Sequence, residues 1–358
     1  MHWTLFCRVV DNLGDVGVCW RLACSLAARG QQVLLVIDDA SALTWMAPGG
    51  AAGVTVQPWP GRGKLPACGD VIVEAFGCDL PPAFVDAMAA TTPAPVWINL
   101  EYLSAEPYVE RSHGLPSPQH NGLMKWFYYP GFTPRTGGLL REPGAMPTAA
   151  DAAGDSLLTR LGCTPARGER LVSLFCYDNP ALPALLHSLG AEPTLLLLTP
   201  GLAQRQVLAT PPGVRRVCLP WLSQLDYDTL LATCDLNFVR GEDSLVRALW
   251  AGRPWVWQAY PQGDGAHVAK LEALLAQWPA PDPVAALWRA WNGLCGAPWL
   301  GLPPLRPAWQ QLCLNWRERL AAQVSLADQL LAFATAKSSR QAPMQASRQA
   351  PGSARISS

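Results

Sequence analysis

The stretch Val9–Asp38, VVDNLGDVGVCWRLACSLAARGQQVLLVID, decides the fold of this chain. An apolar strand expected over residues 3–10 leads into it. The pattern then predicts a helix over residues 16–30, with Gly30 as its terminator, and a buried strand over residues 31–38. Apolar strands that do not alternate, separated by amphipathic helices, are typical of a parallel sheet covered on both faces.

The same alternation continues along the chain. In the first half, further strands are expected over residues 53–59, 70–76 and 95–102, with a helix over 81–90 and an irregular segment over 103–142. In the second half, strands are expected over 169–177, 194–199, 214–221, 235–240 and 253–260, with helices over 181–190, 223–234, 244–252 and 316–336. This order predicts an α/β protein of two facing Rossmann-like lobes, with ligands in the cleft at the carboxyl ends of the strands.

The predicted boundaries follow from composition. Residues 1–150 form the first domain and residues 151–336 the second, joined through the soft stretch Gly144–Ser156. Residues 337–358 carry an imperfect SRQAP repeat and little hydrophobic content, so we expect a disordered tail.

The composition limits the classes of partner. Half of the 358 residues are hydrophobic, and Lys+Arg and Asp+Glu balance at 27 each, so no global field favours nucleic acid or an anionic membrane. The eleven cysteines are scattered without a C-x-x-C pair, which predicts reduced thiols and no zinc site or other metal. The chain lacks a signal-peptide pattern and a membrane-length apolar run, so we expect a cytoplasmic protein.

Two aspartates, Asp11 and Asp15, flank a glycine turn where the first strand gives way to a helix. In one interpretation Asp11 ends the strand and Asp15 caps the helix, because Asp is a favoured N-cap residue. In the other, the two carboxylates point into one cleft, where they hold a cationic group or accept a proton. Two anions would repel a diphosphate, so this position favours an acceptor site.

A second candidate constellation is CDLNFVRGEDSLVRALWAG in the second half. A strand ends at Arg240, and a helix is expected to begin at Ser244. Free amides at a helix start bind phosphates, and Arg240 would add a fixed positive charge. Asp243 and Ser244 are expected to cap the helix, which does not exclude ligand contact. Glu242 opposes a diphosphate, so it either accepts hydrogen bonds from sugar hydroxyls or balances Arg240.

Aromatic and amide side chains near other strand ends are further candidates. Phe175 and Tyr177 alternate onto one face of a strand, where they either pack in the core or stack a nucleobase. Gln224 at a helix start could read a base edge or act as a polar cap. Gln258 and Tyr260 follow another strand, and each could be structural or donor-binding.

Several of these stretches resemble the elongation factor P arginine rhamnosyltransferases. The matching segments include FCRVVDNLGDVGVCWRLA, VIVEAFGCDLP, WINLEYLSAE, YYPGFTPRTGGLLRE, SLFCYDN and CDLNFVRGEDSLVRALWAGRPWVWQAYPQ, which span most of the chain before the tail. The clearest departure is Leu13, where the family usually has phenylalanine.

The resemblance implies a GT-B fold and an inverting transfer of rhamnose from dTDP-β-L-rhamnose, without a cofactor, to one arginine of elongation factor P, which supports translation through polyproline stalls. The donor would bind mainly to the second lobe and the acceptor to the first. By motif position, Asp15 matches the catalytic base, Asp11 a neighbouring essential carboxylate and Glu242 an acid important for activity. The expected donor-binding residues are Phe175, Tyr177, Gln224, Arg240, Asp243 and Ser244.

The resemblance and the residues agree on one division of labour. A guanidinium keeps its proton at neutral pH, so a nitrogen nucleophile needs anions beside it, and two aspartates supply them. An anionic pocket in the first lobe would receive this cation, and a cationic rim in the second lobe the diphosphate. The alternatives are a transferase with a lipid or glycan acceptor and a non-catalytic protein that binds the factor or the nucleotide sugar. A nicotinamide oxidoreductase is disfavoured because the glycine fingerprint is missing.

Overall fold

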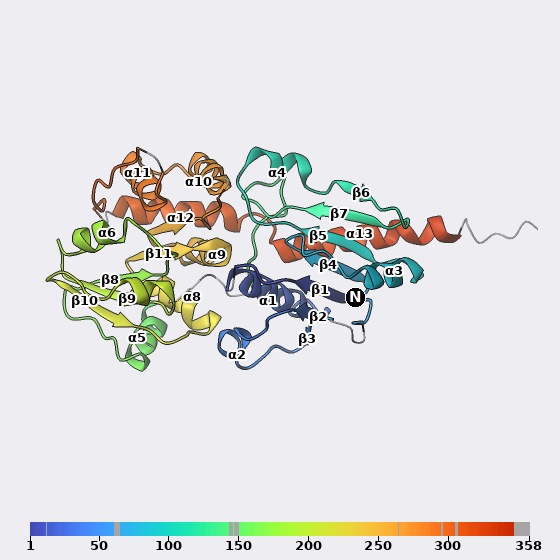
Figure 1. The fold of residues 1–358 in the computed structure, drawn as a ribbon, viewed down its shortest axis with the longest axis horizontal. Coiled ribbons are helices and arrows are strands. Elements are labelled where there is room, and N and C mark those ends of the chain that lie inside the picture. Colours follow the sequence, from blue (N-terminus) through green and yellow to red (C-terminus); the bar gives the residue numbers. More distant parts are fainter. Residues whose placement is uncertain are drawn as a thin grey trace, which may run out of the picture.

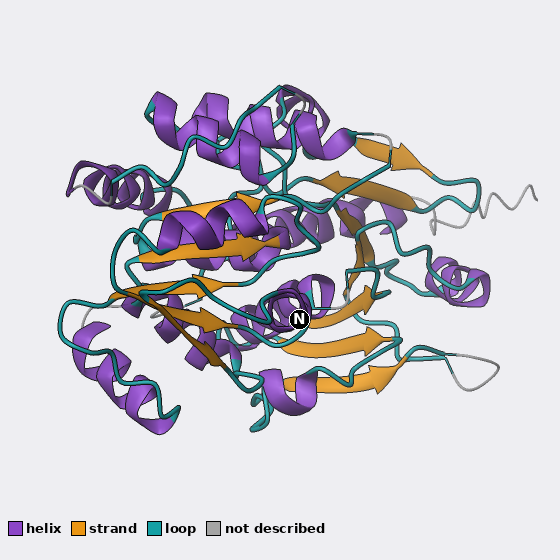
Figure 2. Cartoon of the chain, turned by 60° about the vertical axis from the view of Figure 1, so that its left-hand side comes forward, coloured by secondary structure: helices purple, strands orange, loops and turns teal. Residues whose placement is uncertain are grey.

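The chain is described by a computed structural model, which covers residues 1–11, 13–60, 65–142, 146, 150–263, 265–294, 296–304 and 307–346. These residues form two lobes, each built on its own sheet, that lie side by side along the long axis of the molecule (Figure 1). Helices surround both sheets (Figure 2). The predicted pair of α/β lobes is therefore confirmed.

The first lobe contains a seven-stranded sheet with the order β3-β2-β1-β4-β5-β7-β6. Neighbouring strands run parallel except β6 and β7, which pair antiparallel at one edge. The strands are β1 (His2–Cys7), β2 (Gln32–Ile37), β3 (Val54–Pro58), β4 (Val71–Ala75), β5 (Val96–Leu100), β6 (Pro116–Pro118) and β7 (Met124–Tyr128). Every residue of β4 and β5 is buried, as expected for central strands covered on both faces.

Helices cover both faces of this sheet. On one face, α1 (Gly14–Ala27) packs together with α13 (Leu326–Ala346), whereas α3 (Pro82–Ala90) packs on the other face through Phe84 and Met88. Two short helices, α2 (Leu43–Met46) and α4 (Pro107–Ser112), complete the lobe.

The second lobe contains a five-stranded parallel sheet with the order β10-β9-β8-β11-β12. Its strands are β8 (Arg170–Leu174), β9 (Thr194–Leu198), β10 (Val214–Cys218), β11 (Leu236–Arg240) and β12 (Trp255–Gln258). Its helices are α5 (Ala150–Arg160), α6 (Leu182–Leu189), α7 (Leu202–Gln206), α8 (Gln224–Thr233), α9 (Gly241–Ala251), α10 (Ala266–Gln277), α11 (Asp282–Trp291) and α12 (Pro307–Ala321).

Successive leucines of β9 point to opposite faces of this sheet and join different cores. Leu195 and Leu197 pack with α5 and α8, whereas Leu196 and Leu198 belong to a larger cluster with α6, α10, α11 and α12. In that larger cluster Trp255 stacks on Trp278. The sequence TLLLL of β9 is therefore continuously apolar because this strand is buried on both faces.

The end of the chain corrects two predicted boundaries. Helix α13 returns to the first lobe, where Leu326, Leu330 and Ala334 join the core beside α1 (Figure 1). The second domain therefore does not extend to residue 336. The expected disorder from residue 337 is also wrong as far as Ala346, because the helix continues and the Lys337 ammonium lies 3.4 Å from the ring centroid of Trp126. The remaining residues 347–358 lie outside the described part.

Two segments expected to be irregular contain regular structure. Residues 103–142 include α4, β6 and β7, and β7 was missed because only Tyr128 of its five residues is fully buried. The expected connector Gly144–Ser156 is helical from Ala150, where α5 begins and leads to the buried Leu157 and Leu158. The rest of the connector, apart from Met146, lies outside the described residues.

The carboxyl ends of both sheets face the junction of the lobes. Asp11 and Asp15 follow β1, and helix α1 contacts α9, which follows β11. The ten cysteines that the structure describes are all free thiols. Among the described helices, none has the length and hydropathy of a membrane span.

Candidate active site

Asp15 lies in the first turn of α1 and points back at the loop before it. Its Oδ2 accepts hydrogen bonds from the backbone N–H groups of Val10 at 2.8 Å and Asp11 at 2.9 Å. The N-cap position belongs to Leu13, so Asp15 is not the capping residue that one interpretation of the sequence expected. The carboxylate instead fixes the loop that presents Asp11.

The environment of Asp15 suits a group that accepts a proton. Its side chain is 3% exposed, and burial raises its pKa from 3.8 to about 6, although the two backbone N–H groups oppose the shift. The charges of Asp11 and Glu242 add to the increase in pKa. A carboxylate with a pKa near 6 is ionised at neutral pH and is a stronger base than an exposed aspartate.

Asp11 contacts the opposite lobe. Its Oδ2 accepts a hydrogen bond of 2.8 Å from the Tyr177 hydroxyl, and its Oδ1 lies 3.7 Å from Nη1 of Arg240. The approach requires Gly241, which has a φ of +67° and whose absent Cβ would lie 2.9 Å from Asp11 Oδ2. A side chain at position 241 would therefore push Asp11 away from the second lobe.

Arg240 is held over two aromatic rings at the end of β11. The carbon of its guanidinium lies 4.4 Å from the ring centroid of Phe175 and 4.2 Å from that of Tyr177. The two aromatics thus share one face of the strand end, as the alternation predicted. The buried Nε of Arg240 has no hydrogen-bond partner among the described residues. A buried donor without a partner is what a ligand oxygen would satisfy.

Helix α9 begins earlier than expected. Its first residue is Gly241, with Arg240 at the N-cap, so Asp243 and Ser244 lie within the first turn. Ser244 accepts a hydrogen bond from the Arg240 N–H at 3.2 Å and donates to the Arg240 carbonyl. It fixes the backbone of Arg240 in place of capping the helix.

Glu242 points away from Arg240, toward the first lobe. Its Oε2 accepts a hydrogen bond of 2.8 Å from the Leu103 N–H, and its Oε1 lies 3.0 Å from Nζ of Lys270. Burial raises the pKa of Glu242, and the Lys270 ammonium and the Leu103 N–H counteract part of this shift. Of the two alternatives for Glu242, the pairing with Arg240 is wrong, because Lys270 is its cationic partner.

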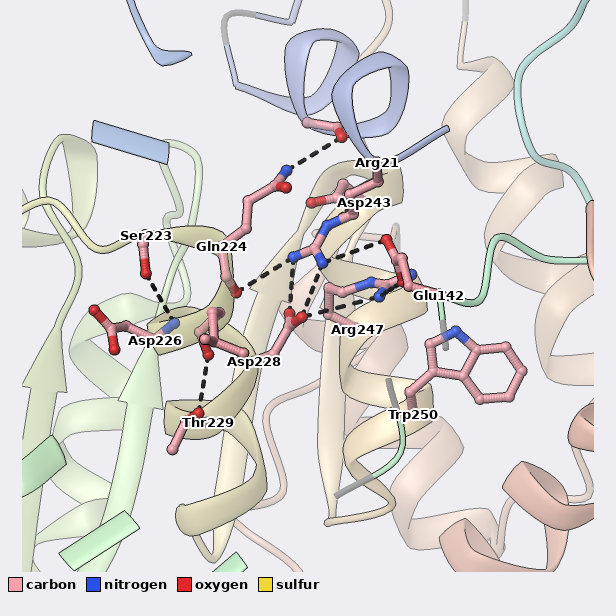
Figure 3. A network of polar contacts seen from close by, with 12 residues as sticks. Arg21, Glu142, Ser223, Gln224, Asp226, Asp228, Thr229, Asp243, Arg247 and Trp250 are labelled. Atoms are coloured by element: carbon pink, nitrogen blue, oxygen red, sulfur yellow. Dashed lines mark hydrogen bonds and ion pairs between the residues drawn. The ribbon is translucent and has the colours of Figure 1, made fainter. Parts of the chain in front are cut away.

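Asp243 belongs to an ionic network around two buried arginines, Arg21 and Arg247, that sequence reasoning missed (Figure 3). Arg21 of α1 reaches across the lobe junction and forms a bidentate pair with Asp228, with both N–O distances at 2.8 Å. Its Nε lies 3.2 Å from Asp243, and its Nη1 lies 3.5 Å from Glu142. Arg247 contacts Glu142 at 2.5 Å from the other side.

Arg21 is ionised and only 6% exposed. Burial lowers its pKa, but the carboxylates of Asp243, Asp228 and Glu142 outweigh burial and raise it overall. The sequence contains one indication of the buried role of Arg21: an arginine in the apolar run VCWRLAC must either reach solvent or have a buried partner.

Gln224 closes the junction next to this network. It is the first residue of α8, and its Nε2 donates a hydrogen bond of 3.1 Å to the Gly17 carbonyl of α1. A Cβ at Gly17 would lie 3.0 Å from Asp243 Oδ2, so glycine permits the close approach of the lobes.

Two adjoining cavities open at the junction. The first, of about 80 Å³, brings together five of the six predicted donor-binding residues with Asp11 and Arg21: Phe175, Gln224, Arg240, Asp243 and Ser244. The second, of about 220 Å³, brings together the three predicted catalytic carboxylates: Asp11, Asp15 and Glu242. We call them the basic pocket and the acidic cavity.

The remaining predicted residues lie elsewhere. Tyr177 is buried behind Arg240 and lines neither cavity. Gln258 uses its amide internally, because Oε1 accepts from the Tyr177 N–H at 2.9 Å and Nε2 donates to the Asp178 carbonyl at 3.2 Å. Tyr260 lines the acidic cavity rather than the basic pocket expected for a donor-binding residue.

Comparisons with known proteins identify the family of this chain. Residues 3–335 match a family described as Elongation-Factor P (EF-P) rhamnosyltransferase EarP. A protein-arginine rhamnosyltransferase of Pseudomonas putida is 44% identical over 369 residues, which cover 92% of this chain and 98% of that protein. One of Pseudomonas aeruginosa is 43% identical over 370 residues with the same coverage.

Solved structures show the same two-lobed fold. A structure described as the basis for EarP-mediated arginine glycosylation of translation elongation factor EF-P is 33% identical, with a TM-score of 0.63, and covers 93% of this chain and 98% of its own. The spinosyn rhamnosyltransferase SpnG has a TM-score of 0.53 at 13% identity, covers 93% of this chain and 99% of its own, and supports the fold alone. The predicted GT-B architecture is confirmed.

Proposed function

The chain belongs to the elongation factor P rhamnosyltransferase family, and from this premise we propose that it transfers L-rhamnose from dTDP-β-L-rhamnose to one arginine of elongation factor P. The single observation that carries the proposal is the juxtaposition of the basic pocket with the acidic cavity, which share Asp11. A transferase for a cationic nucleophile needs an anion site for the leaving nucleotide and a carboxylate site for the acceptor, side by side.

The basic pocket suits the nucleoside diphosphate of the donor. Arg240 has an unpaired buried Nε, and the amides at the start of α9 face the same junction. Phe175 offers an aromatic ring in the same pocket, where a thymine can pack, and Gln224 offers an amide. We assign the donor to these residues.

The acidic cavity suits the arginine acceptor. A guanidinium nitrogen would attack the anomeric carbon as the bond to the dTDP oxygen breaks, with inversion to an α-rhamnosyl-arginine. Asp15 would take the nitrogen proton, Asp11 and Glu242 would hold the remaining positive charge, and Arg240 would stabilise the charge on departing dTDP. This displacement needs no covalent intermediate and no metal.

Arg240 and Asp11 suggest an order of binding. In the free protein these two residues are each other's partners across the junction, at 3.7 Å. A diphosphate on Arg240 would replace Asp11 as its partner and leave Oδ1 of Asp11 available for the acceptor, while Oδ2 keeps its hydrogen bond from Tyr177. We therefore propose that the donor binds before elongation factor P. Because the acceptor is a translation factor, we place the reaction in the cytoplasm and its benefit in translation through polyproline stalls.

Intact-mass analysis of elongation factor P after incubation with the purified protein and dTDP-rhamnose tests the proposal. We expect an increment of one deoxyhexose, and none when lysine replaces the acceptor arginine. The matched control is a Pseudomonas putida relative on the same acceptor and donor batches. An increment with the control enzyme but not with this protein would contradict the proposed function.

A further inference from the structure

Two aromatic residues of the first lobe, Phe76 and Tyr102, line the acidic cavity without a role in the chemistry above. Phe76 follows β4, and Tyr102 follows β5, so the two neighbouring strands bring them together. Their rings are stacked, with centroids 4.4 Å apart and planes 12° apart. They form a single platform on the wall of the cavity that the first lobe contributes.

The backbone beneath this platform is strained. Phe76 has a φ of +58°, a left-handed conformation that is costly for an aromatic residue. The Phe76 N–H donates a hydrogen bond of 2.7 Å to the Leu100 carbonyl, and the Gly77 N–H donates one of 3.2 Å to Asn99 Oδ1. The surrounding bonds hold the ring in this orientation despite the cost, as is common at ligand sites.

A cation of the protein itself already occupies the platform. The Lys270 ammonium, from α10 of the opposite lobe, lies 5.4 Å from the ring centroid of Tyr102 and 3.0 Å from Oε1 of Glu242. An aromatic face together with a carboxylate is the combination that binds ammonium and guanidinium groups. The cavity therefore contains a formed cation site.

The charges around the cavity leave room for one more cation. Its lining includes three carboxylates, Asp11, Asp15 and Glu242, against one cation, Lys270. Arg240 adds a second cation near Asp11 in the free protein. A bound donor diphosphate would engage Arg240, so the carboxylates would exceed the available cations when the acceptor arrives.

We propose that the ring of Tyr102, backed by Phe76, and the carboxylate of Glu242 form the cradle of the acceptor guanidinium, which Lys270 occupies until the acceptor displaces it. This inference rests on the proposed function and names the residues that recognise the acceptor. The cradle selects arginine over lysine, because a planar guanidinium can stack on Tyr102 and still donate in its plane to Glu242. It presents a nitrogen toward Asp15, which lines the same cavity.

The test compares steady-state kinetics for purified elongation factor P at saturating dTDP-rhamnose, with dTDP binding by calorimetry as the check of folding. Tyr102→Leu removes the ring face, and we expect the KM for elongation factor P to rise about tenfold while dTDP affinity stays within about twofold. Tyr102→Phe keeps the ring and should recover most of the lost affinity. The difference between these two variants separates recognition by the ring from a structural role.

Lys270→Met should change the KM for elongation factor P in the opposite direction to Tyr102→Leu. Removing the resident ammonium leaves Glu242 unpaired in the free protein, so the acceptor no longer has to displace a cation. At pH 8 we expect the KM for elongation factor P to fall several-fold. A rise in this KM would overturn the role of Lys270 as an occupant that the acceptor displaces.

The remaining outcomes are distinct from a failure of the proposed function. If the wild-type protein transfers rhamnose but Tyr102→Leu leaves the KM unchanged, or Tyr102→Phe loses as much as Tyr102→Leu, the cradle is wrong and the proposed function stands. If Tyr102→Leu also loses dTDP binding, its role is structural and the cradle is again wrong. If the wild-type protein transfers nothing, the proposed function itself fails.

Discussion

The basic pocket and the acidic cavity lie side by side, and each adds a charge from the opposite lobe to the charge expected there, which is Arg240 in the pocket and Asp15 in the cavity. The sequence placed anions in the first lobe and cations in the second. In the structure the first lobe contributes Arg21 to the basic pocket, and the second lobe contributes Glu242 to the acidic cavity. Each site is therefore built from residues of both lobes, so both ligand sites depend on the contact between the lobes.

The largest expected effect is a loss of catalysis from a change in the acidic cavity alone. Asp15→Asn should lower kcat by about 10³-fold, because the base that takes the guanidinium proton is lost. Affinity for dTDP should stay within about twofold, since Asp15 does not line the basic pocket. Mass spectrometry of elongation factor P and calorimetry with dTDP measure the two effects. The control is Asp39→Asn, an exposed carboxylate of the same lobe, and near-normal turnover by Asp15→Asn would refute its assignment as the base.

The next effect tests whether the two sites share one junction. Arg21→Met removes the cation shared by Asp228, Asp243 and Glu142, and among the ion pairs of the described residues Arg247 then remains for Asp228 and Glu142 but not for Asp243. We expect the free energy of unfolding in urea to fall by about 3 kcal/mol, because buried charges would lose their partner. The exposed Arg205→Met should change it by less than about 0.5 kcal/mol. A loss as small as that of the control would mean that the network does not hold the lobes together.

A smaller effect should appear on the basic side. Arg240→Ala removes the unpaired buried donor and its charge, and we expect the Kd for dTDP to rise about 30-fold. Calorimetry measures the affinity, and Arg205→Ala, on an exposed position of the same lobe, provides the control. Unchanged affinity would show that the diphosphate binds elsewhere.

The smallest expected effect is on thermal stability, which the buried, ionised Asp15 of the acidic cavity lowers. The pKa of Asp15 is raised from 3.8 to about 6, so its protonated form contributes stability at low pH, and this contribution is lost as the pH rises through 6. At pH 8 the ionised carboxylate is therefore a cost that asparagine removes. Asp15→Asn should raise Tm by about 2 °C at pH 8, and the difference should narrow toward pH 5. Scanning calorimetry measures the Tm of both proteins at each pH. A Tm difference that grows toward low pH would contradict the raised pKa of Asp15.

Most of the alternating strands and helices could be predicted, because buried parallel strands such as β4, β5 and β9 are continuous apolar runs. The elements that were missed lack such runs. Strand β7 is half-exposed, and its Lys125 pairs with the buried Glu74, with 3.3 Å between Nζ and Oε2. Helix α13 was predicted as helical, but its return to the first lobe depends on docking beside α1, where Arg29 pairs with Asp328 across a separation of 299 residues, and no local pattern encodes this contact.

The residues of the candidate site were likewise predictable where a local motif marked them. The motifs led to Asp11, Asp15, Glu242 and Arg240, all near strand ends where side chains are free to meet ligands. Arg21, Tyr102 and Lys270 were missed, because each acquires its role only from a partner on another element. Tyr260 was found, but it lies in the acidic cavity instead of the basic pocket.

The sequence by itself determined the two α/β lobes, the family and the carboxylates and arginine at the strand ends, because hydrophobic periodicity and short motifs are local properties of a chain. Only the tertiary structure decided which polar groups meet: Glu242 with Lys270, Asp11 with Tyr177, and Arg21 with Asp228. Those pairings form across a junction between distant segments. Their energies depend on burial and on distances of about 3 Å, and the order of residues does not state either of these quantities.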